Sequence, residues 1–273
     1  VNHIQYRLNM VTYFASDNSR REKLRDILRK CPDMERALTR LTLGRGGPRD
    51  MAAVRDGLAE TANIRAALGN KDLDQPVEGI TNASEQLGFH AELVDDLKKA
   101  LSSDLPLLAR DGGFIAKGYR LDLDELKTLR DESRRHIANL QAKYAADTKV
   151  SGLKIKHNNV LGYFIEITPR FADNMGDGYI HRQTMANAVR YTTVELGELE
   201  DKISRAADRA VALEMTLFDQ LLDKITNWGT KILAAAEAMA VLDVAASHAD
   251  LAIDKVYIRP DVDNSLTFDI KGG

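Results

Sequence analysis

The placement of proline constrains this chain more than any other sequence feature. Its six prolines fall at positions 32, 48, 76, 106, 169 and 260, so residues 170–259 contain none. Proline inside a helix costs about 3 kcal/mol and therefore marks helix boundaries. The longest helices are expected in the proline-free stretch.

Apolar residues recur at steps of three and four from Leu196 to Ala246, which predicts helix over that span. A capping box, Thr192-x-x-Glu195, is predicted at its start, and residues 227–230 are the predicted break. At about 1.5 Å per residue, residues 195–226 would form a rod of roughly 48 Å. A second, antiparallel rod is predicted from another capping box, Asp122-x-x-Glu125.

Between the two rods the apolar period changes to two. Residues 153–157 and 163–167 alternate around Asn158-Asn159, which predicts a β-hairpin, and residues 179–193 are predicted to return through a third strand or an irregular segment. The fold class expected is mainly α, with a helical core and long antiparallel lever helices interrupted by a small β-rich element. Further helices are predicted over 19–29, over 51–68 with Pro48 in the first helical position, and over 84–101, with a strand just before Ile270.

Composition limits the environment in which the chain works. It is 44% hydrophobic with a net charge of only −3, so it is expected to fold rather than stay disordered. No run of 18 apolar residues occurs, and the single Cys31 fits a reducing compartment, so we expect a soluble cytoplasmic protein without membrane contact. The first residue is not methionine and no signal peptide follows, which suggests a piece of a longer protein.

The β-rich segment differs in charge from the rest of the chain. Residues 149–192 hold six basic and three acidic residues, a net +3, which leaves −6 for the remainder. Lysine and arginine bind polyanions by releasing condensed counterions, so this segment could bind nucleic acid. Ordinary variation of surface charge explains the same difference, and charge alone leaves both interpretations open.

Catalytic motifs are not found. The six histidines are scattered without an HExxH pattern, and Gly44-Arg45-Gly46-Gly47 lacks the lysine and hydroxyl residue of a phosphate-binding Walker loop. No GxSxG occurs, and Cys31 has no evident base beside it. We therefore expect no enzymatic activity, no metal and no cofactor in this chain. Met215, Met239 and Trp228 are interpreted as packing residues between helices.

Several longer segments together resemble one known family. They are LKIKHNNVLGYFIEIT (153–168), RQTMANAVRYTTVELGELE (182–200), LTLGRGGPRD (41–50), and the pair Leu242-Asp-Val244 and Arg259-Pro260. Together they resemble the MutS family of bacterial DNA mismatch-repair proteins over essentially the whole chain. The resemblance implies a core and lever region (1–130 and 195–258), an inserted clamp (131–194) and the start of an ATPase domain (259–273).

The resemblance also implies a function. A clamp of this family closes over duplex DNA and contacts phosphates, and the matching positions here are Lys154, Lys156, Asn158, Arg182, Gln183, Thr184, Asn187 and Arg190. Ala186 and Val189 replace a lysine and a glutamate that are common in the family, which puts one phosphate contact in doubt. ATP and magnesium are expected only in an ATPase domain outside this chain. The implied partners are double-stranded DNA, a second copy of the parent protein and other repair proteins, and the implied location is the bacterial nucleoid.

A rival hypothesis belongs to another functional class. The long apolar stripe could bind a partner helix or a second copy, so the chain would be a helical scaffold or oligomerisation module without DNA binding of its own.

Overall fold

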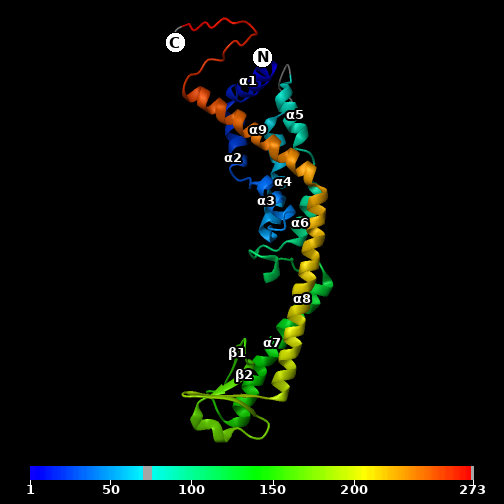
Figure 1. The fold of residues 1–273 in the computed structure, drawn as a ribbon, viewed down its shortest axis with the longest axis vertical. Coiled ribbons are helices and arrows are strands. Elements are labelled where there is room, and N and C mark those ends of the chain that lie inside the picture. The colour runs from blue at the N-terminus through cyan, green and yellow to red at the C-terminus, as the bar shows by residue number, and fades with distance from the viewer. Residues whose placement is uncertain (70–75, 272–273) are drawn as a thin grey trace. The chain divides into compact units, whose positions relative to one another are not determined.

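The computed structural model describes residues 1–69 and 76–271, and these form two compact units (Figure 1). The first unit comprises residues 1–109 and 218–273, and the second comprises residues 110–217. Helix α8 (Val194–Asn227) contributes residues to both units. Each unit is described separately below.

The first unit is helical. Its elements, besides the end of α8, are α1 (Asn2–Ala15), α2 (Asn18–Leu28), α3 (Met34–Thr42), α4 (Pro48–Leu68), α5 (Glu78–Gln86), α6 (Ala91–Ala100) and α9 (Gly229–Asp254). Helix α9 packs against α1, α2, α3 and α5, so it is the central helix of this unit. Pro48 occupies the first turn of α4, as predicted.

Helix α9 is long and apolar enough, by length and composition, to cross a bilayer. Its buried residues nevertheless lie at helical spacing along one face, from Ile232 through Ala235, Met239 and Leu242 to Ala249. That face packs against the other helices of the unit, which explains the apolar composition. We interpret α9 as a core helix.

Two expectations for the N-terminal region were wrong or incomplete. Helices α1 and α3 were not predicted, and the single helix expected over 84–101 is divided into α5 and α6. The division lies at Gly88, whose φ of +60° is a left-handed conformation that ends a helix and favours glycine. The apolar residues on either side continue the helical pattern, so periodicity alone did not reveal the break.

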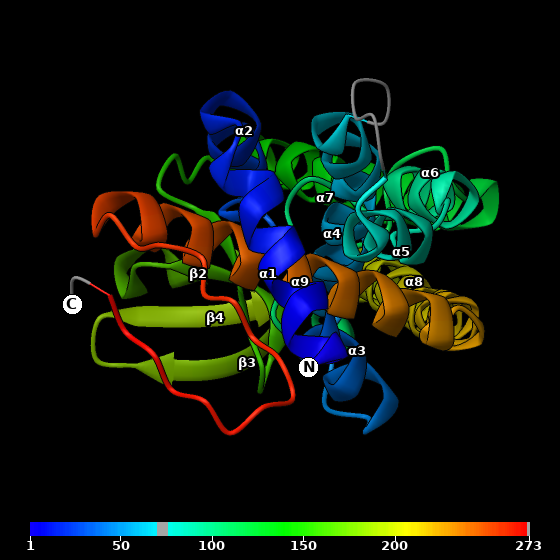
Figure 2. The same ribbon diagram turned by 90° about the horizontal axis from the view of Figure 1, so that it is seen from above.

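The second unit places a small sheet beside two long helices. Its elements are η1 (Ala109–Asp111) at the boundary, α7 (Leu121–Thr148), β1 (Lys154–Asn158), β2 (Gly162–Ile167), η2 (Pro169–Asn174), β3 (Ile180–Met185), β4 (Ala188–Thr192) and the first part of α8. The strands are antiparallel in the order β1-β2-β4-β3, and Figure 2 labels the last three of them. The expected fold class is confirmed.

The hairpin β1–β2 is confirmed, with Ile155 opposite Ile165. The third strand or irregular segment expected over 179–193 was wrong, because this segment forms a second hairpin, β3–β4, that turns at residues 186–187. Ile165 and Tyr191 on the sheet pack against Tyr144 of α7 and Leu196 of α8 in one buried cluster. This cluster fixes which face of the sheet points away from the helices.

The helix break at residue 228 is confirmed, but both predicted capping boxes were wrong. At α8 the cap lies one residue later, where the backbone N–H of Leu196 donates to the hydroxyl of Thr193 at 3.1 Å. At α7 the residue before the helix is Arg120, whose guanidinium pairs with Asp122 at 2.7 Å. The C-terminal strand was wrong as well, because residues 255–271 have no strand in the structure.

A buried carboxylate joins three segments of the second unit. Glu214 of α8 is only 2% exposed. Its carboxylate accepts hydrogen bonds from the backbone N–H groups of Gly113 at 2.6 Å and Ile115 at 3.3 Å. The ammonium of Lys127 on α7 donates to it at 3.0 Å. The loop at 113–115, α7 and α8 are therefore held at one point.

Gly162 opens β2 with a φ of +67°, and a Cβ at this position would overlap the carboxylate of Glu200. Glu200 can move aside because its side chain is flexible, but the backbone conformation remains unfavourable for any L-residue. We expect Gly162→Ala to lower the free energy of unfolding by about 1–2 kcal/mol, measured by urea denaturation.

Gly152→Ala is the control, since a Cβ at Gly152 meets no atom within 4 Å. If Glu200→Ala restored most of the stability lost in Gly162→Ala, overlap rather than backbone conformation would be the cause.

Candidate nucleic-acid interface

The sheet of the second unit has two chemically different faces. Side chains alternate along a strand, so Ile155, Ile165 and Tyr191 point to the core. Their neighbours on the opposite face, called here the outer face, are Lys154, Lys156 and Asn158 of β1, Phe164 and Glu166 of β2, Arg190 of β4, and Gln183 of β3. Cations outnumber carboxylates among these residues.

Two of the predicted cations are free to bind a ligand. Lys154 is exposed on β1, and Arg182 is exposed at an irregularity of β3 between His181 and Gln183. In the part of the chain that the structure describes, neither side chain has an ion pair or a hydrogen bond. Both can therefore approach a phosphate without first breaking an internal interaction.

Lys156 and Arg190 share one carboxylate. The ammonium of Lys156 lies 2.6 Å from Glu166, and the guanidinium of Arg190 lies 3.1 Å from its other oxygen. Arg190 also lies 4.4 Å from the ring centre of Phe164 and donates to Gln183 at 2.9 Å. Arg190 is thus held in place on the sheet, whereas the half-exposed Lys156 has Glu166 as its only side-chain partner among the described residues.

The remaining predicted residues differ in what occupies their polar groups. Asn158 accepts from the backbone N–H groups of Val160 and Leu161, so its side chain shapes the β1–β2 turn. Thr184 bonds to His181 at 2.8 Å. Asn187 is exposed at the tip of the β3–β4 hairpin. The structure therefore brings Lys154, Lys156, Gln183 and Arg190 onto one face but gives Asn158 and Thr184 local roles.

Glu166 organises this face, and the sequence interpretation missed it. The pKa of Glu166 lies below its usual value, chiefly because Lys156 donates a hydrogen bond to the carboxylate. Partial burial raises this pKa, but the hydrogen bond from Arg190 and the charges of Lys156 and Arg190 lower it further. Lys154 lies opposite Glu166 in the hairpin register, and Lys156 lies two residues further along the same face. The alternation of side chains along the two strands could therefore have indicated that Glu166 lies beside these lysines.

Glu166→Gln is expected to tighten binding of a polyanion by about two- to five-fold, because the one carboxylate that competes for Lys156 and Arg190 is removed. The same change should lower stability slightly at neutral pH. Since the pKa of Glu166 is lower in the folded than in the unfolded chain, its stabilisation is complete above the unfolded pKa and is lost as the pH falls through the folded value.

The stability difference between wild type and Glu166→Gln should therefore vanish in acid, which urea denaturation at several pH values measures. Unchanged or weaker polyanion binding by Glu166→Gln would show that the outer face is not the binding surface.

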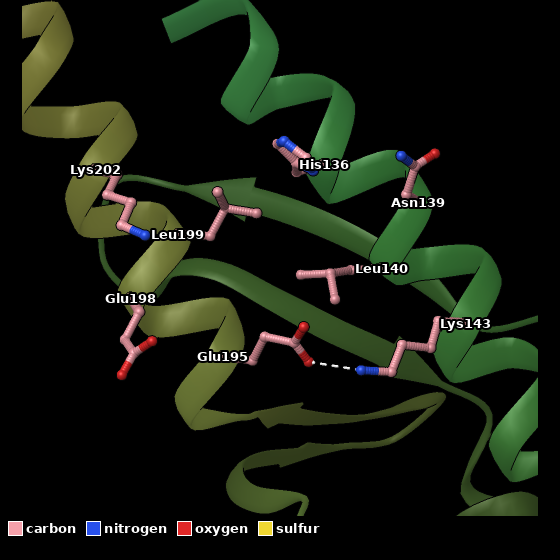
Figure 3. A pocket seen from close by; sticks show the side chains of 8 residues that line it. All are labelled: His136, Asn139, Leu140, Lys143, Glu195, Glu198, Leu199 and Lys202. Carbon is pink, nitrogen blue, oxygen red and sulfur yellow. Dashed lines mark hydrogen bonds and ion pairs between the residues drawn. The ribbon is translucent and has the colours of Figure 1, made fainter. Parts of the chain in front are cut away.

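A groove of about 550 Å³ lies between α7 and α8 beside the sheet. In Figure 3, His136, Asn139 and Lys143 line it from α7, and Glu195, Glu198 and Lys202 from α8. Lys143 pairs with Glu195 at 3.0 Å, which balances part of the charge. The groove has equal numbers of lysines and glutamates and therefore does not single out an anionic ligand. The groove forms because of the way α7 packs against α8, and the sequence analysis did not predict it.

Among residues 1–69 and 76–271, no three His, Cys, Asp or Glu side chains gather closely enough to hold a metal ion. Burial raises the pKa of the Cys31 thiol to about 11, with a smaller contribution from Glu60, so the thiolate form is rare at neutral pH.

Comparison with known proteins identifies the family. A family profile described as MutS domain III matches residues 1–249. The chain belongs to the MutS family. It is 49% identical to a DNA mismatch repair protein MutS of Rhodopseudomonas palustris (strain BisB5), 50% to one of Nitrobacter winogradskyi and 48% to one of Bartonella henselae, with 99% of the chain covered in each case.

The chain spans about 30% of the length of these MutS relatives. The match to MutS domain III includes α1 through most of α9, and therefore both compact units. The expected resemblance is confirmed at the level of the family.

Proposed function

We propose that this chain is a part of a mismatch-repair protein that holds duplex DNA by its phosphate backbone, using the outer face of the four-stranded sheet. The observation that carries the proposal is the free cation Lys154, which shares the outer face with Lys156, Arg190 and their one competing carboxylate. A second free cation, Arg182, lies at the irregularity of β3. The names of the relatives support the same biological role.

The proposed contacts fall into two groups. Lys154, Lys156 and Arg182 are the direct phosphate ligands, because their charged groups are exposed. Arg190 and Gln183 support them, since their mutual hydrogen bond and the Phe164 ring fix their positions. Asn187 is a further candidate at the hairpin tip, while Asn158 and Thr184 shape the backbone that presents the cations.

Such a surface is suited to binding without reading sequence. Contacts to phosphates position a protein on DNA but carry no direct base information. The outer face lies on a sheet and offers cations rather than an element that inserts into a groove. We therefore expect equal affinity for matched and mismatched duplexes.

Fluorescence anisotropy with matched and mismatched duplexes of the same length tests this function. Weak binding that is steeply salt-dependent and the same for both duplexes is expected. A several-fold preference for the mismatch would contradict a backbone-only contact, and no binding at low salt would contradict DNA binding by this chain.

We further propose that α7 and α8 act as lever helices that couple DNA binding to an ATPase domain outside this chain. Helix α8 is continuous over 34 residues and contributes to both units, and Glu214 links it to α7 through Lys127. Rigid helices that move as bodies are one known route of such coupling. ATP and magnesium would bind only in the other domain.

The domain limits remain proposals: core and lever over 1–130 and 195–258, clamp over 131–194, and the start of an ATPase domain over 259–273. The last two residues of that range lie outside the described residues. Assembly of the parent protein as a homodimer, its action with other repair proteins and its place at the nucleoid in the cytoplasm are proposals of the same kind.

The alternative, a helical scaffold, is favoured by one observation. Helix α9 exposes Leu233, Val241, Val244 and Leu251 at helical spacing, a stripe that a partner could cover. Sedimentation of the chain without DNA separates the two functions, because a scaffold requires a stable oligomer. A monomer that binds DNA supports the proposed clamp.

A further inference from the structure

Two buried polar atoms lack any hydrogen-bond partner among the described residues, and they belong to neighbouring side chains. One is Nη1 of Arg65 on α4, and the other is Nδ1 of His90, the residue before α6. Buried polar side-chain atoms are nearly always paired, because an unpaired one costs about 1–3 kcal/mol. The charge of Arg65 also acts on His90, so the two unpaired atoms belong to one region of the first unit.

Their neighbours belong to the first unit: Phe89 precedes His90 in the same loop, Trp228 lies between α8 and α9, and Lys231 lies on α9. The guanidinium of Arg65 lies 3.9 Å from the ring centre of Phe89. His90 is 4% exposed, and its ring lies 5.8 Å from that of Trp228, edge to face. The ammonium of Lys231 lies 4.3 Å from the Trp228 ring. These five side chains are called here the His90 cluster.

The charge of the His90 cluster is uncompensated. In the described part of the chain, Arg65 and Lys231 have no ion pair, and the charged groups that act on His90 are these two cations. Lys231 lies in the first turn of α9, where the helix dipole disfavours a cation. Neither His90 nor Trp228 caps its helix with a side-chain hydrogen bond. An anion would offset all of these charges.

The protonation of His90 narrows the choice of anion. Its Nε2 lies 2.8 Å from the carbonyl oxygen of Leu87, and a carbonyl can only accept, so Nε2 carries a proton. Burial lowers the pKa of His90, and the positive charges of Arg65 and Lys231 lower it further, although the hydrogen bond to Leu87 raises it. The ring is therefore neutral at pH 7, and its Nδ1 is a hydrogen-bond acceptor. The ligand must accept a hydrogen bond from Arg65 and donate one to His90.

We propose that the His90 cluster is a binding site for inorganic phosphate. Hydrogen phosphate has a charged oxygen for Arg65 Nη1 and a P–OH group for His90 Nδ1. Sulfate has no proton near neutral pH, a phosphodiester has none either, and a phosphate monoester loses its second proton near pH 6. The proposed ligand of this site is therefore not a phosphodiester of the DNA backbone. A reaction that hydrolyses a phosphate ester or anhydride is the class that would supply it.

Access to the site depends on Phe89. Its ring is 83% exposed and covers the guanidinium of Arg65, so it has little packing to lose when it turns aside. No part of the proposed DNA-binding face is involved, and the two proposals can fail separately.

Phosphate titration followed by ¹H–¹⁵N NMR of the histidine side chains tests the site. At pH 7.5 and constant ionic strength, phosphate is expected to shift the His90 Nδ1 signal saturably, with sulfate binding about ten-fold or more weakly because it cannot donate to Nδ1. Arg65→Met should weaken phosphate binding about ten-fold. Arg55→Met, on the same helix, is the matched control.

Equal responses to phosphate and sulfate in the wild-type chain would overturn the proposal, and this comparison requires no folded variant. An unchanged phosphate response in Arg65→Met would overturn it as well, and would indicate that a water molecule bridges the two atoms.

Discussion

Replacing Lys154, Lys156 and Arg182 together by glutamate is expected to weaken duplex DNA binding by about 100-fold or more. Three attractive contacts become repulsive, and backbone binding depends on cations that displace counterions from phosphates. All three residues are exposed, so the helical circular dichroism should not change. Fluorescence anisotropy at constant salt measures the loss.

A matched control separates this local effect from net charge. Lys30, Lys98 and Lys99 are exposed lysines of the first unit, and their replacement by glutamate changes the net charge by the same amount. We expect that control to retain most of the DNA affinity. Equal losses in the two triple variants would mean that overall charge, and not the outer face, governs binding.

Glu214→Ala is expected to destabilise the second unit by about 3–5 kcal/mol, the largest stability change in this account. The substitution leaves the backbone N–H groups of Gly113 and Ile115 without this acceptor and removes the ion-pair partner of Lys127. Urea denaturation followed by circular dichroism measures the loss. Glu214→Gln should fall between wild type and alanine, because the amide oxygen accepts but carries no charge.

Glu198→Ala is the control for this prediction. Glu198 lies on the same helix with an exposed side chain, so its removal should change the stability by less than about 0.5 kcal/mol. If Glu214→Ala cost no more than this control, the buried carboxylate would not be what holds α7, α8 and the loop together.

Much of the helical architecture could be predicted from the sequence. The absence of proline and the apolar stripe gave the extent of α8 and α9 and the break at Trp228, since a helix of that length needs both signals. Alternation predicted the hairpin β1–β2, but not its register, and the turn lies at residues 159–161 rather than at Asn158-Asn159. Both predictions rest on local regularities that tertiary contacts did not override.

Features that depend on one residue or on distant contacts could not be predicted. The left-handed conformation of Gly88 divides α5 from α6 within a continuous apolar pattern. The cap of α8 moved from Thr192 to Thr193, a shift of one residue that periodicity does not resolve. The carboxylate of Glu214 looks like any helical glutamate in sequence, and its partners lie about a hundred residues away.

The candidate site was predicted as a set of positions implied by the family resemblance. The resemblance named the cations, but it did not show that Glu166 neutralises part of the charge of Lys156 and Arg190. It also did not distinguish Lys154 and Arg182, whose charges are free, from Asn158, whose oxygen shapes a turn. These distinctions depend on side-chain geometry.

The salt dependence of DNA binding tests the central claim most directly. Each phosphate contact contributes about −0.9 to the slope of log K against log salt concentration. Replacing Lys154 and Arg182 by glutamine should therefore flatten the slope by about 1.8 relative to wild type, on a matched duplex without a mismatch. A slope that stays the same, even with reduced affinity, would contradict phosphate contact by these two residues.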